Sequence, residues 1–189
     1  HGSMKNGLWA PNDYVGFELS GKKLGLVGYG NIGKYLDKMA SGFGMSVEHV
    51  DSKSSSSELD ELLALSDVVC LCLPLDEKTR GLIDGRRLGL LKKTAYLINV
   101  ARGAIIDQGA LLESLQNNTI AGAGLDVFVG EPGSSGEISE QIRSIVSLPN
   151  VVATPHSAFN TPESLDRLGA EIVTNIKSCI EGSPINVVN

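Results

Sequence analysis

Three polar side chains, Arg102, Glu131 and His156, each come shortly after a separate apolar stretch of the sequence. A guanidinium group can hold an anionic oxygen, and an imidazole beside a carboxylate can move a proton to or from a hydroxyl group. These residue types therefore suit one task, which is to bind an anionic oxygenated substrate and transfer its hydroxyl proton. Taken singly, each has an ordinary alternative: a surface ion pair for Arg102, a solvated charge for Glu131 and a turn residue for His156.

A glycine-rich segment at residues 28–33 follows the first apolar stretch and opens a helical pattern. Gly28 permits a tight turn, Gly30 presents no side chain to a pyrophosphate, and Gly33 lets the helix pack closely on the strand. The N–H groups at the start of such a helix bind phosphate. The predicted phosphate contacts are Gly28, Gly30, Asn31, Ile32 and Gly33.

An acidic residue, Asp51, ends the next apolar stretch, close to the distance downstream at which a ribose ligand is found in dinucleotide-binding folds. A carboxylate there accepts hydrogen bonds from the adenine-ribose hydroxyls and repels a 2′-phosphate by roughly 1–4 kcal/mol at contact distance. Asp51 therefore favours NAD over NADP, although the nearby Lys53 weakens this preference. The alternative roles for Asp51 are a helix N-cap or a solvated strand end.

Apolar stretches and helical patterns alternate along most of the chain, which is the pattern of repeated βαβ units. We predict an α/β fold with a Rossmann-type doubly wound parallel sheet, as a single domain with an N-terminal arm. Parallel strands bring their carboxyl ends, and so the polar residues that follow them, to one edge of the sheet. The predicted strands are residues 24–27, 46–50, 68–73, 95–100, 120–127 and 151–154, and the predicted helices are 32–43, 58–65, 86–91, 109–116, 137–147 and 162–181.

The chain is predicted to have three parts. Residues 1–3, before Met4, are typical of an expression-tag remnant, residues 4–22 form an irregular arm, and residues 23–189 form the nucleotide-binding domain. The arm carries Trp9, Tyr14 and Phe17, which need an apolar surface to pack on. That surface is either the arm's own domain or a partner chain.

Composition narrows the possible partners. The net charge of −6 counts against nucleic acid or an anionic membrane as the main partner, and no apolar run approaches the length of a membrane span. Cys70 and Cys72 fall on one face of a predicted strand, but no second cysteine pair or nearby histidine completes a metal site. We therefore predict no metal and interpret them as buried free thiols, which suit a reducing cytoplasm.

Several segments together resemble the nucleotide-binding domain of NAD-dependent D-2-hydroxyacid dehydrogenases, the family of phosphoglycerate, D-lactate and glyoxylate/hydroxypyruvate enzymes. The resemblance covers nearly all of residues 7–189. The matching stretches are residues 28–33, Leu73-Pro74-Leu75 with Thr79, residues 99–103, residues 124–128 with Glu131-Pro132, and residues 154–158.

The resemblance implies a role for each matching position. Arg102 looks like the residue that grips the substrate carboxylate or carbonyl oxygen, His156 like the acid/base, and Glu131 like the partner that orients His156. Asp126 resembles the contact to the nicotinamide carboxamide, and Leu73 and Pro74 the wall of the adenine pocket. The implied cofactor contacts beyond the glycine segment and Asp51 are Leu73, Pro74, Thr79, Val100, Ala101, Asp126, His156 and Ala158.

The resemblance also implies an activity, a hydride transfer between NAD(H) and a small D-2-hydroxy acid or 2-keto acid. The alternative is a dehydrogenase-like, NAD-sensing corepressor or binding protein without metabolic turnover. The family's substrate domain is expected to be absent, so the isolated chain should bind NAD but turn over poorly, since water reaches the open site. A cytoplasmic homodimer, formed through the nucleotide-binding domain, is expected by analogy.

Overall fold

The computed structural model describes residues 2–13, 15–133 and 136–187, and the chain divides into two compact units, His1–Ala153 and Thr154–Asn189. The sequence placed residues 23–189 in one domain, and whether the second unit packs onto the first as part of that domain stays a prediction.

The first unit is built on a six-stranded sheet in which every neighbouring pair of strands is parallel. Its strand order, β2-β1-β3-β4-β5-β6, reverses direction between β1 and β3, which is the doubly wound arrangement. The predicted fold class is confirmed. The strands are β1 (Lys23–Val27), β2 (Ser46–Val50), β3 (Val68–Leu71), β4 (Tyr96–Asn99), β5 (Gly122–Leu125) and β6 (Val151–Ala153).

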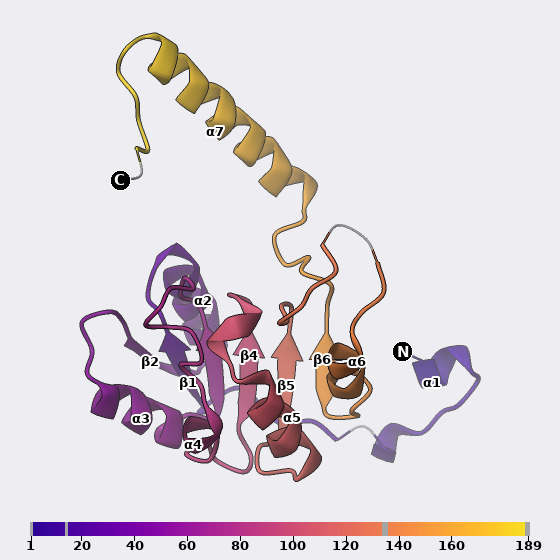
Figure 1. The fold of residues 1–189 in the computed structure, drawn as a ribbon. Helices are drawn as coiled ribbons and strands as arrows, with labels where there is room; N and C mark the ends of the chain where they lie inside the picture. Colours follow the sequence, from indigo (N-terminus) through magenta and orange to yellow (C-terminus); the bar gives the residue numbers. More distant parts are fainter. Residues whose placement is uncertain (1, 14, 134–135, 188–189) are drawn as a thin grey trace. The chain divides into compact units, whose positions relative to one another are not determined.

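Helices of this first unit pack on both faces of the sheet, because alternate strand residues point to opposite faces. Ala40 of α2 packs in a small cluster with Leu24, Leu26 and Cys70, whereas a larger cluster joins α3, α4, α5 and α6 to the opposite face. Figure 1 shows α3, α4 and α5 together on one side of the strands. The helices are α2 (Asn31–Gly42), α3 (Ser56–Leu65), α4 (Gly85–Leu88), α5 (Gln108–Gln116) and α6 (Glu140–Val146).

Side-chain caps explain where several of these helices begin. Ser55 caps α3 in a capping box with Glu58, Asp107 accepts the N–H groups of residues 109 and 110 at the start of α5, and Ser139 caps α6. Each such cap contributes about 1 kcal/mol. Because Ser55 fills the cap of α3, the alternative role of Asp51 as a helix N-cap is excluded.

The arm is less irregular than predicted, since it contains a 3-10 turn, η1 (Pro11–Asp13), and the end of a short helix, α1 (Gly2–Lys5), that begins before it. These short turns close through local backbone hydrogen bonds, which leave little sequence signal. The ring of Phe17 stacks on Tyr96 of β4 with 5.3 Å between centroids, so part of the arm lies on its own sheet. Trp9 is 81% exposed, and Tyr14 lies outside the described residues.

The second unit consists mainly of one helix, α7 (Pro162–Ile180). Thr161 caps it by accepting the N–H of Ser164, and Pro162 occupies its first turn as predicted. Apolar side chains recur along α7 at helical spacing and are exposed: Leu165, Leu168, Ile172 and Ile176. In the described part of the chain, no helix combines the length and apolar character needed to cross a membrane.

Candidate cofactor and catalytic site

Two adjoining pockets lie at the carboxyl edge of the sheet and share Cys72, Leu73 and Pro74. The first, of about 730 Å³, lies between the loops after β1, β2 and β3, and the second, of about 480 Å³, lies between α2 and the loops after β3 and β4. The predicted residues in the first pocket are Gly28, Gly30, Asp51, Leu73, Pro74 and Thr79, and those in the second are Ile32, Leu73, Pro74, Val100, Ala101 and Arg102. Residues from five separate parts of the sequence thus meet at one edge.

The glycine loop has the geometry expected of a phosphate cradle. Gly28 has φ +98°, and a Cβ there would stand 2.5 Å from the carbonyl oxygen of Cys72; at Gly33 it would stand 2.6 Å from that of Gly28. At Gly30, by contrast, no atom lies within 4 Å of an added Cβ, and this residue opens α2 without a side-chain cap. The first N–H groups of α2 therefore suit a pyrophosphate placed over Gly30.

The carboxylate of Asp51 is exposed at the end of β2 and lines the first pocket. It accepts the backbone N–H of Lys53 at 2.8 Å, which fixes the turn after the strand. Only one of its oxygens is used in this bond. The contact between this carboxylate and the adenine-ribose hydroxyls stays a prediction.

Thr79 closes the loop that follows Pro74. Its hydroxyl donates to the Pro74 carbonyl at 2.8 Å, and its backbone N–H donates to the Asp76 carboxylate at 2.8 Å. That second bond holds the pKa of Asp76 below its usual value. Thr79 therefore shapes the first pocket as well as lining it.

Asn99 braces the turn that presents Arg102. The residue is 1% exposed. Its Oδ1 accepts the N–H of Ala101, and its Nδ2 donates to the carbonyl of Arg102, both at 3.0 Å. Arg102 is exposed at the second pocket, and its Nη1 donates to the Ala101 carbonyl at 2.7 Å. The Asn99 amide therefore holds the backbone of the turn that carries Ala101 and Arg102.

The loop after β5 carries Asp126 and Glu131. Asp126 is 5% exposed, and its N–H donates to the Asn99 carbonyl at 3.0 Å. The Oε1 of Glu131 accepts the N–H of Phe128 at 2.8 Å. Gly103 lies directly against Phe128, because an added Cβ at Gly103 would stand 2.1 Å from the Phe128 carbonyl carbon. The loops that carry Arg102 and Glu131 are therefore packed backbone to backbone.

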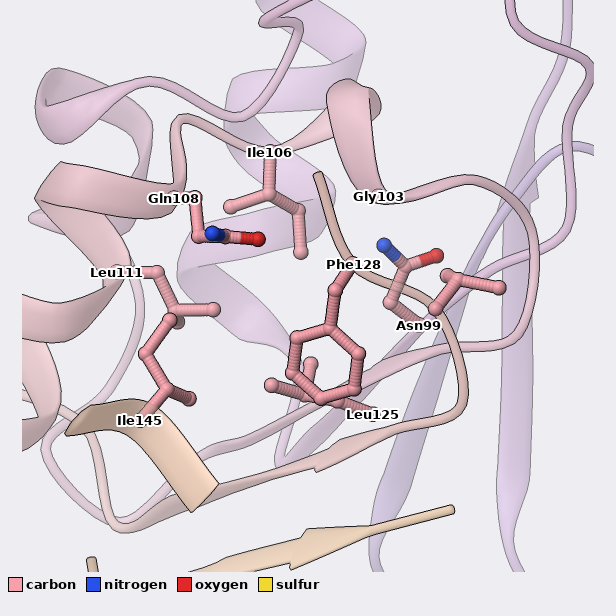
Figure 2. A pocket seen from close by; sticks show the side chains of 9 residues that line it. Asn99, Gly103, Ile106, Gln108, Leu111, Leu125, Phe128 and Ile145 are labelled. Carbon is pink, nitrogen blue, oxygen red and sulfur yellow. The ribbon is translucent and has the colours of Figure 1, made fainter. Parts of the chain in front are cut away.

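A further residue, Gln108, holds this loop and was missed by the sequence analysis. Gln108 is 8% exposed at the start of α5, and its Oε1 accepts the N–H of Val129 at 2.8 Å. Figure 2 shows its amide beside Ile106 and Leu111, above the ring of Phe128. A bond between residues 21 apart in the chain has no short-range sequence signature.

Replacing Gln108 by methionine should loosen this loop without unfolding the chain. Methionine has a similar length and fits the apolar surroundings, and it removes the Nε2 donor, which is buried without a hydrogen-bond partner among the described residues. We expect stability to stay within about 1 kcal/mol, and amide exchange of Val129 to rise about fivefold to tenfold as one hydrogen bond is lost. Unchanged Val129 exchange, relative to the exposed control Gln116→Met, would contradict this role.

His156 and Ala158 belong to the second unit. His156 has φ +52°, a left-handed backbone conformation in which histidine is several-fold enriched, and its N–H donates to the Thr154 carbonyl at 3.1 Å. Its ring meets Phe159 edge-on at 6.0 Å. Its proximity to Glu131 stays a prediction. In the part of the chain that the structure describes, no group of three metal-ligating side chains is found.

The family described as "D-isomer specific 2-hydroxyacid dehydrogenase, NAD binding domain" matches residues 1–158. The chain belongs to this family. It is 36% identical to glycerate dehydrogenase of Methylorubrum extorquens over 98% of the chain and 60% of that enzyme, and 39% identical to hydroxypyruvate reductase of Thermotoga maritima over 92% of the chain and 58% of that enzyme. A crystal structure of a D-isomer specific 2-hydroxyacid dehydrogenase from Lactobacillus delbrueckii ssp. bulgaricus, complexed with NAD, superposes with a TM-score of 0.87 at 34% identity.

This NAD-binding domain family confirms two predictions made from the sequence, the family and the cofactor. The Lactobacillus match covers 98% of the chain and 61% of that structure. The chain thus spans about three fifths of the length of the relatives named here. Geometry agrees with the cofactor, since a cradle open at Gly30 adjoins a carboxylate at Asp51.

Proposed function

We propose that the chain is the NAD-binding part of an enzyme that transfers a hydride between NAD(H) and a small D-2-hydroxy acid or its 2-keto acid. The observation that carries this proposal is the pair of adjoining pockets, which runs from Asp51 past the glycine loop to Arg102. The names glycerate dehydrogenase and hydroxypyruvate reductase favour turnover over the NAD-sensing alternative. A cytoplasmic location suits the three free cysteines.

In this proposal, NAD supplies or accepts the hydride, and the chain's side chains bind the substrate and move its proton. Arg102 holds the substrate carboxylate or carbonyl oxygen through charge-assisted hydrogen bonds. His156 donates a proton to the carbonyl oxygen during reduction and removes the hydroxyl proton during oxidation. Glu131 orients the imidazole and stabilises its charged form, and Asp126 contacts the nicotinamide carboxamide.

Turnover by the full-length parent protein tests this function. We assign the substrate domain to the part of the parent that corresponds to the unmatched two fifths of the relatives. With a panel of 2-keto acids and NADH, the parent should oxidise NADH and form the D-isomer of the product, whereas the 189-residue chain should bind NADH with little turnover. A parent that binds NAD and reduces none of these acids would favour the sensing alternative.

The choice between NAD and NADP is assigned to Asp51. Replacing it by serine removes the charge that repels a 2′-phosphate while keeping a small polar side chain. Since that repulsion is about 1–4 kcal/mol, we expect the ratio of NADP to NAD affinity to rise at least about fivefold. Calorimetric titration with both cofactors measures it. The control is Ser57→Ala, in α3 outside the pocket lining, and an unchanged ratio in Asp51→Ser would remove this assignment.

A homodimer through the nucleotide-binding domain is also proposed. Four large apolar side chains recur along α2 and its end and are each more than half exposed: Ile32, Tyr35, Met39 and Phe43. A patch of this kind on a water-soluble domain typically marks a protein interface. A second copy is the occupant we propose, because Trp9 of the arm is also exposed.

Replacing Met39 by glutamate places a charge in the middle of this patch and should shift the chain from dimer to monomer. Light scattering across a concentration series measures the change. The exposed position Lys38 provides a matched control, Lys38→Glu, which adds the same carboxylate beside the patch. A wild-type chain that stays monomeric at high concentration would rule the proposed dimer out.

A further inference from the structure

Two thiols lie side by side at the end of β3, and the proposed reaction gives neither of them a role. Cys70 and Cys72 project to the same side of the strand with 3.6 Å between their sulfur atoms, and both are free. Cys70 is 3% exposed in the core under α2. Cys72 is only partly buried, and it lines both pockets at the carboxyl edge.

The surroundings make the two thiols chemically different. The hydrogen bond with Cys72, together with burial, raises the pKa of Cys70, so that Cys70 stays protonated and can donate to its neighbour. That hydrogen bond from Cys70 lowers the pKa of Cys72. Thiolates are the reactive form of cysteine, and reactivity also requires access, which the pockets give only to Cys72.

The backbone of Cys72 is fixed to the glycine loop. Its N–H donates to the Val27 carbonyl at 2.8 Å, and its own carbonyl lies against Gly28, where an added Cβ would be 2.5 Å away. A group added to this sulfur therefore cannot move far from the junction of the two pockets. A dinucleotide that spans both pockets must cross the same junction.

We propose that Cys72 is a site of oxidation by hydroperoxides, and that oxidation of Cys72 and binding of NAD exclude each other. This inference rests on the proposed function, since it places NAD across both pockets. In the reaction, the Cys72 thiolate attacks one peroxide oxygen, an S–O bond forms and the O–O bond breaks. The leaving group, hydroxide from hydrogen peroxide or alkoxide from an organic hydroperoxide, takes up a proton to give water or an alcohol, and the cysteine becomes a sulfenic acid. The sulfur is oxidised by two electrons and the peroxide is reduced by two.

The rate of this oxidation can be compared at two cysteines in the same molecule. The chain is treated with hydrogen peroxide and a sulfenic-acid trap, with and without NAD, and labelling is followed by peptide mass spectrometry. With NAD at about 100 times the Kd measured by calorimetry, labelling of Cys72 should slow about 100-fold. Cys179 is exposed on α7 and serves as the internal control, with an unchanged rate.

The reverse experiment asks whether oxidation prevents binding. Peroxide-treated chain should lose NAD binding in proportion to the fraction of Cys72 oxidised, and Cys179→Ser should behave like the unaltered chain. The NAD affinity of Cys72→Ser should be the same before and after peroxide. Equal Cys72 labelling with and without bound NAD, or equal peroxide sensitivity in Cys72→Ser, would overturn the inference. A chain that binds no NAD by calorimetry would overturn the proposed function, and this inference with it.

Discussion

Replacing Gly28 by alanine is expected to destabilise the chain by about 2–5 kcal/mol and to abolish NAD binding. At φ +98° an L-residue is strained, and the new Cβ would stand 2.5 Å from the carbonyl oxygen of Cys72. That oxygen cannot easily retreat, because the N–H of Cys72 is tied to β1 through Val27. Denaturant unfolding gives the loss of stability, and calorimetric titration with NAD gives the loss of binding.

The matched variant Gly30→Ala separates an effect on the stability of the fold from an effect on cofactor binding. Gly30 lies two residues away in the same loop, has φ −79°, and has no atom within 4 Å of an added Cβ. Stability should therefore change by less than about 1 kcal/mol, while affinity for NAD falls because the methyl group occupies the space of the pyrophosphate. If Gly30→Ala bound NAD as tightly as the unaltered chain, the pyrophosphate would not lie over this loop.

In the full-length parent, replacing His156 by asparagine is expected to lower kcat by about 10²–10⁴-fold. Asparagine tolerates the left-handed backbone found at φ +52°, so the turn should survive while the proton-transferring ring is lost. Steady-state kinetics with NADH and the preferred 2-keto acid measures the effect. A variant that keeps the parent's rate would show that His156 is not the acid/base.

Glu131→Gln is the companion variant, because it keeps the shape of the loop and removes only the charge. The amide oxygen can still accept the N–H of Phe128, as Oε1 of Glu131 does at 2.8 Å. We expect kcat to fall because a neutral amide no longer stabilises the charged imidazole, with amide exchange at Phe128 unchanged. Glu131→Ala should lose both the charge and the hydrogen bond to the Phe128 N–H. Equal kcat in the unaltered parent and in Glu131→Gln would contradict the orienting role of Glu131.

Most of the fold could be predicted because its signals are local. Every strand of the sheet falls within or beside a predicted apolar stretch, and the positive φ of Gly28 is itself a local reason for glycine at that position. The predicted strands at residues 68–73 and 120–127 are longer than β3 and β5, because pairing stops where the neighbouring strands end. The sequence remains apolar beyond the last paired residue, so it does not indicate where the strand ends.

The residues that support the site were harder to foresee than those that line it. Arg102, Glu131 and Asp51 could be identified by their places after strands, but Gln108 and Gly103 act through contacts with a loop some 20–25 residues away. Such contacts depend on how β4, α5 and β5 pack and leave no periodic pattern. Glutamine at the start of a helix is also ordinarily exposed, so residue type alone predicts that Gln108 is on the surface and not buried.

The most direct test is a calorimetric titration of the 189-residue chain with NADH and, separately, with NADPH. We expect saturable binding of one NADH per chain and weaker binding of NADPH, because the proposed role of Asp51 places its carboxylate at the adenine ribose. No saturable binding of NADH, or binding of NADPH as tight as that of NADH, would contradict this expectation.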